Sequence, residues 1–224
     1  MDAREIFELN IPPGKLAITW FNSYSGVVVK TPEATLIFDP VKASLGDYVQ
    51  ADAIVITHEH LDHFDPVLAM ELHRKTKAPI LTTPFVARSL PGGNVKALKV
   101  GDCFAVKDVK LHALRCDHPA NEPLSFAIST RTGITVYHPG DSDPFPEMAE
   151  IVSEYRPAIV LYVGTSLGNA ARIARLVKPR TIVSYYTDAE SQRRLNELIQ
   201  KEAPGTKART IKRFEIYQYP NSIC

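Results

Sequence analysis

The sequence predicts an α/β or α+β domain in which two sheets pack face to face and helices cover the outer faces. The first half of the 224 residues is rich in short apolar runs bounded by turn formers, which is typical of strands. The second half alternates helical periodicity with short buried strands. Apolar residues make up 45% of the chain and no composition shift divides it. We therefore expect a single layered domain over residues 1–224.

Each expected element follows from its local pattern. Asp65 is the predicted N-cap of a helix that has Pro66 in its first turn and cations in its last turn. The pattern of the first half predicts mostly hairpin-like strands. The strands are expected at 15–21, 26–31, 34–40, 53–57, 79–83, 95–100, 103–108 and 109–116, and the helix at 64–76. A hairpin at 125–130 and 134–141 follows, joined by the turn at 131–133.

The second half reads as alternating helices and strands. Thr187 and Glu190 have the spacing of a capping box at the start of the last helix. The elements expected here are helices at 146–155, 167–178 and 187–202 and strands at 158–163 and 180–186.

Bulk properties exclude several classes of protein. The net charge of +1 favours neither nucleic acid nor an anionic membrane, and no apolar stretch reaches the roughly 20 residues of a membrane span. The acidic N-terminus is unlike a signal peptide, and Cys103, Cys116 and Cys224 are too few and too scattered for a disulfide framework. We expect a cytoplasmic protein with free thiols and a small-molecule substrate, and a homo-oligomer stays open.

Residues 54–65, "IVITHEHLDHFD", place three of the seven histidines directly after a buried strand. Residues two apart in extended backbone point to one side, so His58 and His60 can converge, and Asp62 and His63 follow in the turn. Imidazole and carboxylate together suit zinc, iron or manganese. A polar loop whose histidines cap the next helix is the alternative. Three histidines and an acid within six residues at a strand end favour a metal site.

The pattern H-x-H-x-D-H resembles the signature of the metallo-β-lactamase superfamily, in the small metal-dependent hydrolase branch similar to L-ascorbate-6-phosphate lactonase. Residues 18–40 resemble the opening strands that end in an aspartate, here Asp39. Residues 95–119 resemble the strands that lead to a third histidine ligand, which maps onto His118. "GITVYHPGDSD" resembles the strand that ends in a bridging aspartate, here Asp141. The resemblance implies a four-layer αβ/βα sandwich with metals at one edge of the sheets.

By this resemblance His58, His60 and His118 hold a first divalent metal with Asp141. Zinc is the first choice, and manganese or iron are alternatives. A second site would combine Asp62, His63 and the same Asp141.

Two positions depart from the family pattern. The last ligand position falls on Tyr186, and no histidine follows His138. Relatives often carry a histidine where this chain has Tyr24. A phenol with a pKa near 10 is a poor ligand, so the second site is weakened or empty and the chain binds one or two ions.

The implied activity is hydrolysis of an ester, lactone or phosphoester of a small molecule by a metal-bound hydroxide. Asp62 and Asp141 are the expected catalytic residues that orient the water and accept its proton. Tyr186 or Tyr24 is placed to donate a hydrogen bond to the developing oxyanion.

Two alternatives remain: a nuclease of the same superfamily, and a non-catalytic metal- or ligand-binding protein with a degenerate second site. His73, His112 and His138 are interpreted as helix-end, strand and supporting residues, not as ligands.

Overall fold

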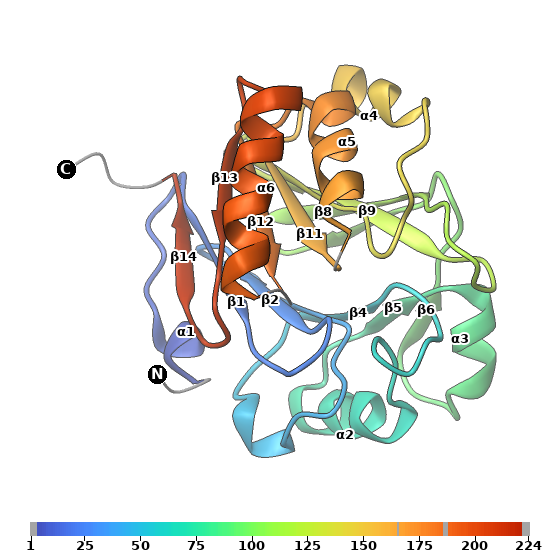
Figure 1. Ribbon diagram of the computed structural model, residues 1–224. Coiled ribbons are helices and arrows are strands. Elements are labelled where there is room, and N and C mark those ends of the chain that lie inside the picture. Colours follow the sequence, from blue (N-terminus) through green and yellow to red (C-terminus); the bar gives the residue numbers. More distant parts are fainter. Residues whose placement is uncertain (1–3, 165, 186–187, 221–224) are drawn as a thin grey trace.

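The computed structural model describes residues 4–164, 166–185 and 188–220, which form two mixed β-sheets packed face to face (Figure 1). Across sheet A the order is β14 (Ile216–Tyr219), β1 (Leu16–Trp20), β2 (Val27–Lys30), β3 (Thr35–Phe38), β4 (Ala53–Ile56), β5 (Ile80–Thr82) and β6 (Val95–Ala97). Across sheet B it is β13 (Lys207–Thr210), β12 (Thr181–Tyr185), β11 (Ile159–Val163), β10 (Thr135–His138), β9 (Leu124–Thr130), β8 (Val109–Arg115) and β7 (Cys103–Val106).

Helices cover the outer face of each sheet. Sheet A carries α1 (Glu5–Glu8), the 3₁₀ turn η1 (Leu45–Asp47), α2 (Pro66–Thr76) and α3 (Pro84–Ser89). Sheet B carries α4 (Met148–Tyr155), α5 (Leu167–Val177) and α6 (Ala189–Glu202). Figure 1 shows α2 and α3 below the sheets and α4, α5 and α6 above them. The predicted four-layer αβ/βα sandwich is confirmed.

Strand β4 shows how the sequence builds these layers. All four of its residues are buried, because both of its faces are covered. Ala53 and Val55 face the apolar cluster between the two sheets, whereas Ile54 and Ile56 face the cluster under the helices of sheet A. The two-residue period of a strand thus distributes one continuous apolar run between two cores.

Sheet A differs from the hairpin-like arrangement expected for the first half. Strands β3, β4, β5 and β6 pair in parallel. A parallel pair needs a crossover, and α2 supplies it between β4 and β5. The expectation is confirmed for β1 to β3 and for β7 with β8, which pair antiparallel, and is wrong for β3 to β6. A short buried apolar run fits either kind of sheet, so it did not separate the two cases.

Five elements were not predicted from the sequence: α1, η1, α3, β13 and β14. They are short, and β13 shows only a weak alternation of exposed and half-buried residues. The predicted capping box of the last helix is also wrong. Asp188 is the N-cap of α6 and accepts a hydrogen bond from the Ser191 amide. Aspartate is at least as good an N-cap as threonine, and Thr187 lies outside the described residues.

The strand directions bring distant loops to one edge. Strand β3 is parallel to β4, and β8 and β10 both run antiparallel to β9, so these two are parallel to each other. The amide of Leu124 at the start of β9 donates to the carbonyl of Thr57 after β4, which joins the two sheets at this edge. Loops after β3, β4, β8 and β10 therefore meet there.

Among the described residues, no helix is both long and apolar enough to cross a membrane.

Candidate metal centre

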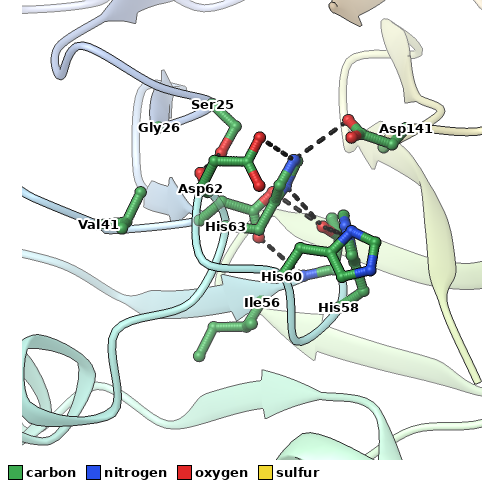
Figure 2. A network of polar contacts seen from close by, with 12 residues as sticks. Ser25, Gly26, Val41, Ile56, His58, His60, Asp62, His63 and Asp141 are labelled. Atoms are coloured by element: carbon green, nitrogen blue, oxygen red, sulfur yellow. Dashed lines mark hydrogen bonds and ion pairs between the residues drawn. The ribbon is translucent and has the colours of Figure 1, made fainter. Parts of the chain in front are cut away.

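Five of the predicted site residues converge at this edge of the two sheets. His58, His60 and His118 offer ligand atoms that all lie within 4.8 Å of one another, and the same limit holds for His58, His63 and Asp141. Figure 2 shows the side chains from the loop after β4 turned toward Asp141, which comes from the other sheet. The expected clustering is therefore present, and His58 belongs to both groups.

The loop after β4 folds so that its histidines share one side. The amides of His63 and Phe64 both donate to the carbonyl of His60, which closes a tight turn. Asp65 then caps α2 as predicted, by accepting from the amides of Val67 and Leu68. A buried strand on one side and a capped helix on the other therefore fix this loop at both ends.

His118 comes from the loop after β8, and its Nε2 lies 3.1 Å from Nδ1 of His60. This loop is tied to the histidine loop by Asn121, whose backbone amide and side-chain amide both donate to Oε1 of Glu59, at 2.8 and 2.7 Å. Glu59, the residue between the two histidines, therefore holds His118 in register with them.

Asp141 follows β10 after a glycine with a positive φ of 60°. Its Oδ1 lies 3.1 Å from His63 Nε2 and its Oδ2 lies 3.9 Å from His118 Nε2. Ser142 accepts a hydrogen bond from the amide of Asp117 at 2.9 Å, which connects the loop of Asp141 to the loop of His118.

Asp39, at the end of β3, binds two residues of the segment that carries the site histidines. It is fully buried, and its carboxylate accepts from the Thr57 amide, the Thr57 hydroxyl and His63 Nδ1, at 2.8, 2.9 and 2.8 Å. Aspartate is among the residues that best tolerate its left-handed backbone conformation, at φ 46°. The structure therefore gives Asp39 the role of a partner to a site histidine.

His58 offers a free lone pair in a buried place. Its ring is fully buried, and Nε2 has no hydrogen-bond partner among the described residues. Burial is the main cause that lowers its pKa to about 3, with the charge of His63 adding to it, so the ring is neutral. A buried and unpaired nitrogen on a neutral imidazole, whose ring centroid lies 4.6 and 4.8 Å from those of His60 and His118, fits a divalent metal ion, whose binding would satisfy it.

His63 is in the opposite electrostatic state. Burial lowers its pKa, but the carboxylates of Asp39 and Asp141 outweigh burial and raise the pKa to about 10. The 3.1 Å approach of His63 Nε2 to Asp141 is an ion pair and is not aligned as a hydrogen bond. In the metal-free protein His63 is therefore a buried cation between two anions, and a metal must displace its proton.

This charge state predicts a pH-dependent stability. A histidine whose pKa rises from 6.5 to about 10 on folding stabilises the protein fully below pH 6.5, and the effect is lost as the pH rises through about 10. The free energy of unfolding of metal-free protein should fall between pH 6.5 and about 9.5. Denaturant titrations should show a smaller fall in His63→Gln. Equal slopes in the two proteins would contradict the assignment.

Asp62 lies at the mouth of the cluster. Its side chain is 40% exposed, its Oδ2 is 3.8 Å from His63 Nε2, and its backbone carbonyl accepts from the hydroxyl of Ser25 (Figure 2). The carboxylate therefore reaches both solvent and the second group of ligand atoms.

The two tyrosines that the sequence suggested for oxyanion binding have different outcomes. Tyr186 lies outside the described residues. Tyr24 is half-buried, and its phenol oxygen accepts a hydrogen bond from Nζ of Lys42 at 3.0 Å.

The remaining histidines lie outside both groups of ligand atoms. His138 is buried, accepts from the Gly140 amide through Nδ1 and contacts the Tyr185 hydroxyl through Nε2 at 3.1 Å. His73 contacts the Ala78 carbonyl at the end of α2, and His112 is half-buried in β8. Strand alternation alone could not show that His138 braces the glycine before Asp141.

Comparison with known proteins shows which family the chain belongs to. Residues 21–195 match the model of the beta-lactamase superfamily domain. A metal-dependent hydrolase of Myxococcus xanthus is 27% identical over 196 residues, which cover 76% of this chain and 70% of the relative. One of Pyrobaculum islandicum is 26% identical over 225 residues, or 90% of this chain and 96% of the relative.

Two solved structures share the fold. A metallo hydrolase of Ignicoccus hospitalis matches with a TM-score of 0.78 at 22% identity, covering 92% of this chain and 98% of its own. A metal-dependent hydrolase of Parabacteroides distasonis matches with a TM-score of 0.76 at 24% identity, covering 92% and 97%. The chain belongs to the beta-lactamase superfamily, as a metal-dependent hydrolase.

Proposed function

We propose that this metal-dependent hydrolase binds one divalent metal, with zinc as the first choice, through His58, His60, His118 and Asp141. Its substrate is an ester, lactone or phosphoester of a small molecule. The observation that carries the proposal is the buried and unpaired Nε2 of the neutral His58 ring, in a group where His58, His60 and His118 offer ligand atoms within 4.8 Å of one another. With Asp141 as a fourth ligand beside the three histidines, water or substrate would take a fifth position, which catalytic zinc can accommodate.

When bound, a divalent metal lowers the pKa of a coordinated water to roughly 7 and polarises the oxygen under attack. The protein's own groups do the rest. Asp62, half-exposed at the mouth, is placed to orient the attacking water and accept its proton. Asp141 contacts both His63 and His118, so it connects the two groups of ligand atoms.

A second metal would use Asp62, His63 and Asp141. We propose that this site is weak, for two reasons. No histidine follows His138, so the last ligand position has only Tyr186 to offer. In addition, the raised pKa of His63 makes metal binding compete with a proton.

Elemental analysis of protein purified without added metal, followed by a panel of esters, lactones and phosphoesters, tests the proposal. We expect close to one metal per chain and hydrolysis of one substrate class that a chelator abolishes. Preferential cleavage of RNA or DNA would favour the nuclease. A loaded protein that hydrolyses nothing in the panel would favour the non-catalytic metal-binding protein.

Asp62→Asn keeps the shape of the side chain and removes the proton acceptor. We expect kcat to fall by about 100-fold or more, the scale of general-base catalysis, with metal content unchanged. Asp65→Asn is the matched control in the same loop, because asparagine caps a helix as well as aspartate does. If Asp62→Asn hydrolyses the substrate as fast as Asp65→Asn, Asp62 does not have this role.

A further inference from the structure

The hydroxyl of Thr57 lies between a carboxylate and two site imidazoles. Thr57 directly follows β4 and precedes His58, and it is fully buried. Its Oγ1 lies 2.9 Å from Asp39 Oδ2, 3.0 Å from His58 Nδ1 and 3.3 Å from His63 Nδ1. The hydroxyl carries a single proton, so it can donate a hydrogen bond to only one of these three groups.

The chemistry of the partners decides where that proton goes. An ionised carboxylate only accepts hydrogen bonds, so the Thr57 hydroxyl donates to Asp39. His63 points its own Nδ1 proton at the same carboxylate over 2.8 Å, so the longer contact between His63 and Thr57 needs no donor from Thr57. The lone pairs of the Thr57 oxygen then remain to accept a hydrogen bond.

His58 Nδ1 is the group left to donate to that oxygen. The proton of a neutral His58 therefore sits on Nδ1, and Nε2 carries the lone pair. This agrees with the independent finding that Nε2 is buried and has no hydrogen-bond partner among the described residues, on a ring whose centroid lies 4.6 and 4.8 Å from those of His60 and His118. The opposite tautomer would bury an unpaired N–H next to two imidazoles.

We infer that Thr57 is a positioning residue that fixes the tautomer of His58 and so determines which ring nitrogen binds the metal. The backbone of Thr57 suits this role, because its amide donates to Asp39 and its carbonyl accepts from Leu124 of the other sheet. Both backbone groups of Thr57 are therefore fixed by hydrogen bonds, which fixes the position of its hydroxyl. Asp39 therefore acts on His58 indirectly, through the Thr57 hydroxyl, and on His63 directly, through its own hydrogen bond.

Thr57→Val removes the hydroxyl at nearly constant volume, and Thr57→Ser restores it. We expect Thr57→Val to weaken zinc binding by about 10- to 100-fold, the usual effect of losing a partner of a metal ligand. Thr57→Ser should stay within a few-fold of the wild type. Competition with a zinc-chelating dye measures the affinities, and denaturant unfolding of the metal-free proteins shows whether each variant is folded.

The tautomer can be read directly in metal-free protein, by long-range nitrogen–proton NMR of isotope-labelled histidine. We expect the His58 proton on Nδ1 in the wild type and in Thr57→Ser, and a shift toward Nε2 in Thr57→Val. A wild-type proton on Nε2, or zinc affinity in folded Thr57→Val equal to that of Thr57→Ser, would overturn the inference. The choice of metal-binding nitrogen rests on the proposed metal role of His58, but the tautomer does not. A protein that shows the expected tautomer and binds no metal would refute the proposed function and leave the effect of Thr57 on the tautomer standing.

Discussion

His118→Ala is expected to lose tight zinc binding and, with it, hydrolysis, while the protein stays folded. The substitution removes one of three imidazoles, and losing only a partner of a ligand already costs about 10- to 100-fold in affinity, so we expect a decrease of at least about 100-fold. The side chain is 16% exposed and lies in a loop, so its loss leaves no large cavity in the core. Equilibrium dialysis against buffered zinc measures the change.

His112→Ala is the matched control for this prediction. His112 lies in β8, the strand that leads to the loop of His118, and belongs to neither group of ligand atoms. The zinc affinity of the His112→Ala protein should equal that of the wild type. If His118→Ala binds zinc as tightly as His112→Ala does, the three-histidine assignment is wrong.

Asp39→Asn is expected to have the second largest effect, because it acts on both metal positions. The carboxylate satisfies three donors, whereas an amide offers a single oxygen and turns an N–H group toward at least one of them. The pKa of His63 should fall, since Asp39 helps to raise it. We expect zinc affinity to fall by about 10- to 100-fold and the free energy of unfolding to fall by about 1–3 kcal/mol.

Asp52→Asn separates these two effects. Asp52 accepts from the amide of Thr35 and pairs with Lys107, at the end of β3 away from the metal centre. The substitution should lower stability without changing zinc affinity. Calorimetric titration with zinc, alongside denaturant unfolding, gives both quantities for each variant. An Asp39→Asn protein whose zinc affinity matches that of Asp52→Asn would contradict the organising role of Asp39.

The sequence predicted the residues of the centre better than the contacts between them. The spacing of His58 and His60 and their place after a buried strand already indicated convergence on one side. That His118 and Asp141 meet them required the resemblance to a known family, because nothing local links positions 58 residues or more apart. The structure adds the mechanism of the link, in that both loops follow parallel strands of sheet B that end at the edge shared with β4.

Other features could not be predicted because they depend on hydrogen-bond direction and not on residue type. A threonine before a histidine is an ordinary strand end by pattern, and only the position of Asp39 shows what the Thr57 hydroxyl does. Similarly, the sequence assigned His63 to the second metal site, but the two carboxylates that make it a cation come from different sheets. The direction of β3 to β6 was mistaken because a short buried run fits a parallel sheet and the core of a sandwich equally well.

A crystal structure of the protein soaked in zinc, with an anomalous difference map at the zinc edge, tests the central claim most directly. The account predicts one strong peak at bonding distance, about 2.0–2.1 Å, from a ring nitrogen of each of His58, His60 and His118. The bonded atom of His58 should be Nε2. Any peak near His63 should be weaker. A saturating soak that leaves no peak between these three rings, or that places the strongest peak elsewhere, would contradict the account.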